Sequence, residues 1–211
     1  MTMLSNLAPI PELYVSYDSA QKLKVEASEL TSHDLSPRQI CDLELLMNGG
    51  FNPLKGFLSE DDYNGVVDNM RLTTGELWPM PITLDVSEDF AASIELGQDI
   101  ALRDQEGAIL GTMTVTDRWE PNKPKEAKKV FGRDDEAHPA VNYLYNQAGK
   151  IYLGGPVTGI QQPEVKARLI ANTEDSVARG NFGSPSFFAG AEMFFGKDKL
   201  EAFEAYIAAQ A

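Results

Sequence analysis

Three side chains could act as imidazole or thiolate groups in catalysis or metal binding: His33, His138 and Cys41. A nucleophilic cysteine needs a nearby base, and a zinc site needs several such ligands at regular spacing. None of the three has such a partner close to it in the sequence. We therefore expect His33 to lie at the surface or to cap a helix, His138 to make buried hydrogen bonds and Cys41 to fill the core. The sequence predicts no catalytic residue, no metal site and no cofactor.

Three charged residues, Arg38, Asp42 and Glu44, lie close together in the sequence. Asp42 and Glu44 have the composition of an acid–base pair, but residues two apart on a helix point in different directions. Arg38 and Asp42 are four apart and can pair across one helical turn. An exposed pair of this kind contributes about 0.3–0.5 kcal/mol, so we interpret it as a structural detail.

Residues 51–58 form a loop punctuated by glycine and proline, with two phenylalanines that look exposed, Phe51 and Phe57, and one lysine, Lys55. Two interpretations stay open: the loop plugs its own domain, or it is a docking surface for another domain. The string Gly154-Gly155-Pro156 also allows two interpretations. It could cradle an anion, but we favour a tight exit from a domain.

The charge balance excludes some classes of function. The chain has 211 residues, with 18 basic and 32 acidic side chains and a net charge of −14. Residues 164–211 hold seven acids and five bases, so 12 of the 14 excess negative charges lie in residues 1–163. Such a field repels nucleic acids, because their binding needs a cationic surface. We interpret the basic stretch from Lys123 to Arg133, which includes Glu126, as a solvated face.

Targeting signals and disulfides are not expected. No apolar run approaches the roughly 18 residues of a membrane span, and no N-terminal stretch joins basic residues to a long apolar segment. The single cysteine permits no internal disulfide. These features predict a cytoplasmic protein without membrane contact.

Capping residues and apolar spacing predict the helices of the first 163 residues. Ser36 and Pro37 begin one that ends before Asn48-Gly49-Gly50, and Ser59 begins another that continues to Met70. Two shorter helices are expected near residues 125–131 and 140–145. Strand-forming residues predict strands at residues 14–17, 79–86, 99–103, 108–116 and 151–155. A hairpin with strands before and after it indicates a small β-rich barrel.

The pattern changes after residue 163, which we take as a domain boundary between residues 1–163 and 164–211. Residues 164–179 have helical spacing. Residues 185–188 and 192–195 predict two short aromatic strands around a turn at Ala189-Gly190, and Asp198 begins a last helix.

Five strings occur in order along the first three quarters of the chain. They are NLAPIPELYV from Asn6, SPRQICDLELL from Ser36, NGGFNPLKGF from Asn48, WPMPITLDV from Trp78 and YLGGPVTGI from Tyr152. With them, residues 4–163 closely resemble the N-terminal domain of ATP sulfurylase (sulfate adenylyltransferase), of the type fused to adenylylsulfate kinase. The resemblance implies a PUA-like β-barrel packed against a separate catalytic domain.

The family's catalytic signature is not found in this sequence. In the resembling family, ATP and sulfate bind a domain that carries a Gln-x-Arg-Asn-Pro-x-His string, whose charged groups stabilise negative charge on the phosphate. Neither His33 nor His138 lies in that setting, and no Walker-type phosphate loop occurs. The resemblance thus implies a non-catalytic domain linked to sulfate assimilation.

Residues 165–211 resemble a second family. The strings ANTEDSVARG from Ala171, FGSPSFF from Phe182 and EMFFGKDKL from Glu192 look like the C-terminal end of 2-hydroxychromene-2-carboxylate isomerase, a kappa-class glutathione transferase with a thioredoxin-like fold. That resemblance implies glutathione contacts. The residues concerned are Ser184, a cis Pro185, Lys197 and Asp198. Lys197 departs from the small hydroxyl residue common in the family.

Together these observations predict an α+β fusion protein: a PUA-like β-barrel with flanking helices, followed by the C-terminal half of a thioredoxin fold. Two short aromatic strands leave an open edge and an uncovered face, so we expect a dimer or close docking within the chain. Three functions compete. The first is a non-catalytic module that binds itself or a sulfurylase-like catalytic domain; the second is glutathione binding or isomerase-like activity of the tail; the third is RNA binding, which the charge opposes.

Overall fold

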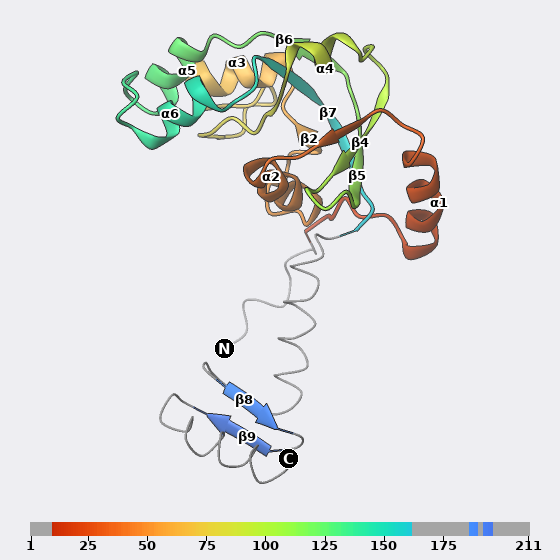
Figure 1. The fold of residues 1–211 in the computed structure, drawn as a ribbon. Coiled ribbons are helices and arrows are strands. Elements are labelled where there is room, and N and C mark those ends of the chain that lie inside the picture. The colour runs from red at the N-terminus through yellow and green to blue at the C-terminus, as the bar shows by residue number, and fades with distance from the viewer. Residues whose placement is uncertain (1–9, 162–185, 190–191, 196–211) are drawn as a thin grey trace. The chain divides into compact units, whose positions relative to one another are not determined.

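Strand β7 (Ile151–Gly159) is the centre of the main sheet (Figure 1). It pairs antiparallel with four strands: β2 (Gly56–Phe57), β3 (Leu84–Val86), β5 (Ile109–Thr114) and β6 (Asp117–Trp119). Tyr152 and Leu153 of β7 pair with both β3 and β6, so these two strands lie on opposite edges of β7. The long strand β7 therefore connects the shorter strands on its two edges into one half-barrel.

The computed structural model describes residues 10–161 and the backbone of two short strands, residues 186–189 and 192–195. The chain divides into two units, residues 1–163 and 164–211, and each is described by itself.

The sheet continues beyond β5 through two more strands. Strand β4 (Asp99–Arg103) pairs antiparallel with β5 and forms the predicted hairpin, with a register shift between Leu102 and Arg103. Strand β1 (Ser32–Asp34) pairs parallel with β4 and forms the edge of the sheet. Seven strands take part, in an arrangement of mixed strands and helices that fits the predicted α+β class.

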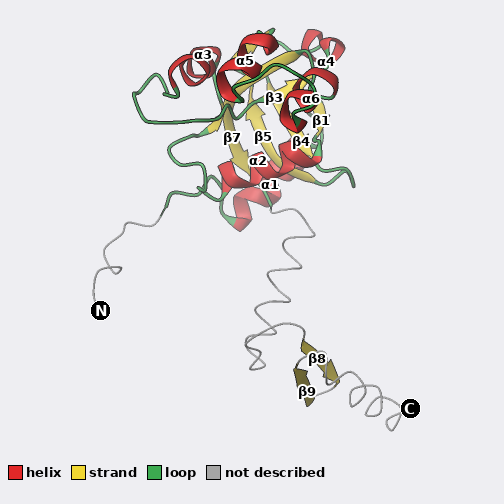
Figure 2. Cartoon of the chain, turned by 90° about the vertical axis from the view of Figure 1, so that its left-hand side faces the viewer, coloured by secondary structure: helices red, strands yellow, loops and turns green. Residues whose placement is uncertain are grey.

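Within residues 10–161, six helices flank the sheet (Figure 2). Helix α2 packs against β7 and helix α1 against β5, while α5 contacts both α3 and α6. Their bounds are α1 Tyr17–Ala27, α2 Pro37–Met47, α3 Glu60–Asn69, α4 Glu88–Ala92, α5 Lys123–Val130 and α6 Pro139–Asn146.

Helix α2 shows how the local sequence fixes these elements. The Ser36 side chain accepts a hydrogen bond from the Gln39 backbone, and the Gln39 side chain accepts one from the Ser36 backbone, which makes a capping box. Pro37 occupies the first turn, where its missing N–H costs nothing. The apolar stripe Leu43, Leu46 and Met47 is then fully buried in the core around β7.

Replacing Ser36 by alanine is expected to lower the free energy of unfolding by about 1 kcal/mol, because the N-terminal amides of α2 lose their acceptor. Urea denaturation followed by circular dichroism measures this. Ser36→Asn restores an acceptor and serves as the control. An equal loss in both variants would show that the cap contributes nothing.

Two glycines allow strands to cross closely within the half-barrel. A Cβ atom on Gly155, whose φ is +149°, would lie 1.9 Å from the carbonyl oxygen of Thr114. A Cβ on Gly56 would lie 2.0 Å from the oxygen of Gly155. The predicted domain exit at Gly154-Gly155-Pro156 is therefore wrong. These residues lie inside β7, at the point where β2, β5 and β7 meet.

Two predicted strands are also corrected. Residues 14–17 contribute one isolated bridge at Tyr14, because Ser16 caps a helix that begins at Tyr17. In residues 79–86 only Leu84–Val86 is strand, since Pro79 and Pro81 lack the N–H that a ladder needs.

The second unit contains an antiparallel hairpin, β8 (Ser186–Ala189) and β9 (Glu192–Phe195). The two strands predicted from the aromatic residues are confirmed, with β8 shifted by one residue. A hairpin alone does not define a thioredoxin-like fold. The two helices predicted on either side lie outside the described residues.

Candidate functional site

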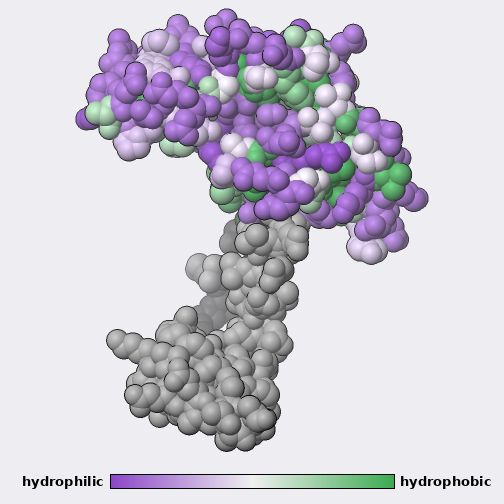
Figure 3. Space-filling model, in the orientation of Figure 1, coloured by the Kyte–Doolittle hydropathy of each residue, from purple (hydrophilic) through white to green (hydrophobic). Residues whose placement is uncertain are grey.

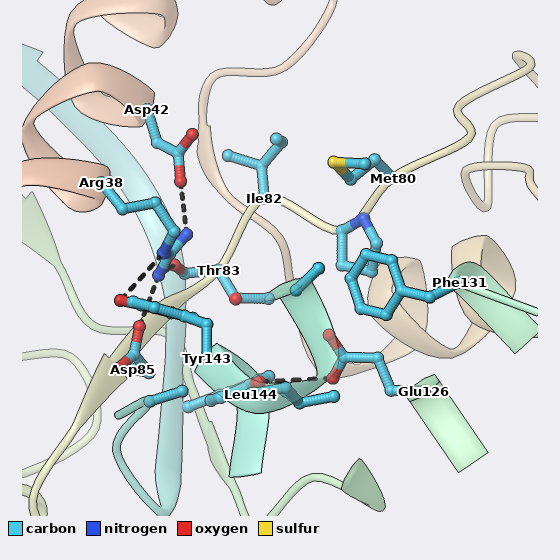
Figure 4. Close-up of a pocket in the computed structure, with 14 residues that line it drawn as sticks. Arg38, Asp42, Met80, Ile82, Thr83, Asp85, Glu126, Phe131, Tyr143 and Leu144 are labelled. Atoms are coloured by element: carbon cyan, nitrogen blue, oxygen red, sulfur yellow. Dashed lines mark hydrogen bonds and ion pairs between the residues drawn. The ribbon is translucent and has the colours of Figure 1, made fainter. Parts of the chain in front are cut away.

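A pocket of about 360 Å³ opens between helices α2, α5 and α6 and the segment that leads into β3 (Figure 4). It is lined by apolar side chains and a small set of polar ones. The lining residues are Arg38, Asp42, Met80, Pro81, Ile82, Thr83, Asp85, Glu126, Phe131, Ala140, Tyr143, Leu144, Ala148 and Tyr152. The volume falls in the lower part of the range found for small-molecule sites.

Arg38, in the first turn of α2, lies at one end of this pocket. Its guanidinium pairs with Asp42 on the same helix and with Asp85 on β3, and it donates to the Thr83 carbonyl at 3.1 Å. Its Nε donates to the Tyr143 hydroxyl at 3.3 Å. The pair predicted across one turn is present, and it belongs to a partly buried network.

Asp85 joins three parts of the chain. Its carboxylate accepts hydrogen bonds from Arg38, from Gln39 Nε2 at 3.0 Å and from the Gly149 backbone N–H at 2.6 Å. Its side chain is 7% exposed. A buried carboxylate needs such donors, because an unpaired charge in the interior is costly. Asp85 therefore holds α2, β3 and the start of β7 in register.

Glu126, on α5, is the second buried acid. Its Oε2 accepts hydrogen bonds from the Tyr63 hydroxyl at 2.8 Å and the Tyr152 hydroxyl at 3.2 Å. Burial raises the pKa of Glu126, and the two tyrosine donors oppose that rise. Burial and the neighbouring carboxylate also raise the pKa values of Tyr63 and Tyr152. Burial likewise raises the pKa of Asp42, against the effect of Arg38.

The raised pKa of Glu126 predicts a pH dependence of stability. A carboxyl with a higher pKa in the folded state binds protons more readily there, so its contribution to stability is largest below its unfolded pKa and is lost as pH rises through its folded pKa. Glu126→Gln removes this titration. The free energy of unfolding of the variant, relative to that of the wild type, should therefore improve between pH 4 and pH 7. Urea titrations at pH 4, 5, 6 and 7 test this, and a constant difference would contradict it.

The two histidines lie on different elements, His33 on β1 and His138 before α6. His33, on β1, is partly buried, with Nε2 3.4 Å from the Gln39 side-chain oxygen and its ring 5.1 Å from that of Phe90. Burial lowers its pKa. His138 occupies the N-cap position of α6 but makes no capping hydrogen bond, and its buried Nδ1 has no partner among the described residues.

Cys41 is exposed on α2, so our expectation of a core residue is wrong. Apolar neighbours such as Ile40 suggested burial, but the buried stripe of α2 follows Leu43, Leu46 and Met47. Cys41 falls on the opposite side of that turn.

The loop residues we singled out do not line this pocket. Phe57 is 3% exposed and belongs to the core, so the expectation of exposure is wrong for it; pairing of β2 with β7 turns it inward. Phe51 is partly buried and packs edge-on against Trp78, with ring centroids 5.7 Å apart. Lys55 is exposed and lies beside a second hollow that Ser59 and Thr116 also line.

Sequence reasoning missed Asp85, Glu126 and the tyrosines of the pocket. Glu126 lies among lysines, and this stretch predicted a solvated face. The structure instead buries Glu126 and Ala127 on one side of α5 while the lysines stay partly or fully exposed. The apolar spacing around Ala127 was the available signal.

Some predictions fall outside the described part of the chain. The glutathione contacts predicted at Ser184, Pro185, Lys197 and Asp198 all lie there. Within the described residues, no helix is long and apolar enough to cross a membrane, and no group of three or more His, Cys, Asp or Glu side chains is placed to hold a metal.

The half-barrel with flanking helices is the architecture of a PUA-like domain. A family model described as "PUA-like domain" matches residues 6–162, and the chain belongs to this family. The curated proteins to which the chain is similar include several sulfate adenylyltransferases. The sulfate adenylyltransferase of Eremothecium gossypii is 45% identical over 184 residues, which are 86% of this chain and 37% of that protein. The Saccharomyces cerevisiae enzyme is 48% identical over 141 residues, 67% of this chain and 27% of that protein.

A solved structure is also similar to this chain in fold and sequence. The "Hexameric APS kinase from Thiobacillus denitrificans" matches with a TM-score of 0.56 and 29% identity, over 81% of this chain and 30% of that chain. The chain thus spans about a third or less of the length of the proteins it resembles. The similarity to sulfate adenylyltransferases is confirmed for the first unit, and the comparisons do not support the resemblance of the tail to an isomerase.

Proposed function

We propose that residues 6–162 are the PUA-like module of the sulfate adenylyltransferase system, and that they serve sulfate assimilation in the cytoplasm as a non-catalytic interaction module. The observation that carries this is the identity of 45–48% to such enzymes over most of the chain. The match to a hexameric protein favours a module that meets other subunits or domains.

The chemistry of the pocket supports a non-catalytic role. Adenylyl transfer needs cations or hydrogen-bond donors directed at phosphate oxygens. The guanidinium of Arg38 is already engaged by Asp42 and Asp85. The pocket would repel a polyphosphate, because three acidic residues line it: Asp42, Asp85 and Glu126. Among the described residues, this pocket therefore offers no arrangement suited to transferring an adenylyl group.

The activity test uses the purified chain in an ATP–pyrophosphate exchange assay with sulfate. We expect exchange at background, whereas exchange at enzymic speed would overturn the proposal.

The interaction test asks whether the chain binds a sulfate adenylyltransferase truncated to lack its own matching region. We expect a complex in analytical ultracentrifugation, or self-association of the chain alone. Lys55→Glu should weaken the complex if the loop at residues 51–58 is the docking surface, and Lys22→Glu on exposed α1 is the matched charge-reversal control. A strictly monomeric chain that binds no truncated enzyme would contradict the interaction role.

A second candidate concerns the tail. The antiparallel pairing of β8 and β9 is the arrangement that the glutathione hypothesis requires of residues 186–195. Titration calorimetry of the full chain with glutathione tests it, with Lys197→Ala and Asp198→Ala as variants and Lys22→Ala as control. The hypothesis fails if no heat of binding is measured.

A further inference from the structure

The pocket between α2, α5 and α6 has features that its structural role does not account for. Its walls are largely apolar, with Met80, Ile82, Phe131 and Leu144 facing one space. The pocket opens to solvent and is not an enclosed cavity, so a small molecule can enter it. Here about 360 Å³ stays open.

One polar atom is directed into that space. Glu126 is 6% exposed, and both of its hydrogen bonds end on Oε2. Its other carboxylate oxygen accepts no hydrogen bond within the described residues. Figure 4 shows this oxygen on the side of the Glu126 carboxylate away from the dashed hydrogen bond, toward Phe131 and Met80. This oxygen is not among the fully buried polar atoms that lack a partner, so it is accessible from the pocket and can accept a hydrogen bond from a ligand there.

The charges around the pocket point to the sign of that partner. Three carboxyl groups, those of Asp42, Asp85 and Glu126, and one guanidinium line the pocket. That guanidinium is engaged by Asp42 and Asp85 at the far end. Lys123 lies near Glu126, but its Nζ donates to the Ala148 carbonyl at 2.8 Å. With Glu126 ionised, three carboxylates stand against two cationic groups, those of Arg38 and Lys123, so the excess charge around the pocket is negative.

We propose that this pocket binds a small organic cation, an amine or amidine carried on an apolar body. The cationic group donates to the free oxygen of Glu126, and the body packs between Met80, Ile82 and Phe131. The two tyrosine hydroxyls on Oε2 stabilise the carboxylate that the cation needs. This inference is independent of the proposed role in sulfate assimilation.

The test uses benzamidine as the probe, with the full chain and saturation-transfer NMR followed by calorimetry. Benzyl alcohol and benzoate are the neutral and anionic controls of similar size. We expect benzamidine to bind about tenfold or more tightly than benzyl alcohol, because a charge-assisted hydrogen bond is involved. Benzoate should not bind.

Variants place the probe in this pocket. Glu126→Gln keeps the shape and removes the charge, and it should reduce benzamidine binding about tenfold. Glu106→Gln removes a charge from an exposed turn and should change nothing. Met80→Ala should weaken binding, whereas Met70→Ala should not; these methionines are 52% and 54% exposed, so they form a matched pair.

A second variant keeps the proposal testable if Glu126→Gln does not fold. Ala140→Phe places a large ring in the pocket from α6 and leaves Glu126 unchanged; its melting temperature without ligand shows whether it folds. It should abolish benzamidine binding. The proposal is overturned by absent binding to the wild type, by equal binding of benzamidine and benzyl alcohol, or by binding that survives Ala140→Phe.

Discussion

Asp85→Ala is expected to lower the free energy of unfolding by about 3–5 kcal/mol, because it removes one partner from a buried ionic network. The carboxylate is 7% exposed and accepts from Arg38, Gln39 and the Gly149 N–H. Its loss leaves the Gly149 N–H without its acceptor and takes one acceptor each from the Arg38 guanidinium, which keeps Asp42, and from the Gln39 amide, which keeps the Asp85 carbonyl. Urea denaturation measures the change.

The control for this prediction is a matched series. Asp85→Asn keeps one acceptor oxygen and should cost less than Asp85→Ala. Glu106→Ala, in an exposed turn, should fall within about 0.5 kcal/mol of the wild type. If Asp85→Ala also stays within that limit, the network contributes nothing to folding.

The second large effect is expected at Gly155. An alanine Cβ there would meet the Thr114 oxygen at 1.9 Å, and the φ of +149° is unfavourable for any residue with a side chain. Backbone atoms of β5 cannot turn aside as a flexible side chain can. We expect Gly155→Ala to lower the free energy of unfolding by about 3–5 kcal/mol.

Gly107 supplies the control for Gly155. It also has a positive φ, +87°, but a Cβ there has no atom within 4 Å. Gly107→Ala should therefore cost only about 1 kcal/mol, from backbone conformation alone. Equal effects of the two alanines would show that close approach to Thr114 does not matter.

The sequence predicted local structure well where capping and periodicity are strong. Ser36 with Pro37, and Ser59 before three acids, marked helix starts that the structure confirms. Alternating residues at 108–116 marked β5, although its bounds are narrower. These signals act between residues close in the chain, so they can be read without knowing the fold.

The pocket could not be predicted in the same way. Arg38, Asp85 and Glu126 are far apart in the sequence. They line one pocket because β7 pairs with β3, which carries Asp85, and places Tyr152 beside Glu126 of α5. Phe57 looked exposed because its loop is rich in glycine and proline; the pairing that buries it involves residues almost a hundred positions later. Pairing between strands so distant in the chain cannot be recognised from the neighbouring residues in the sequence.

The edges of the main sheet also bear on how the protein behaves at high concentration. Its outer strands are β1, β2, β3 and β6, and each is two or three residues long. A short edge offers few unpaired amides and carbonyls on which a neighbouring chain could add a strand. The first unit should therefore resist growth into fibrils, and any self-association should proceed through side chains rather than through extension of the sheet.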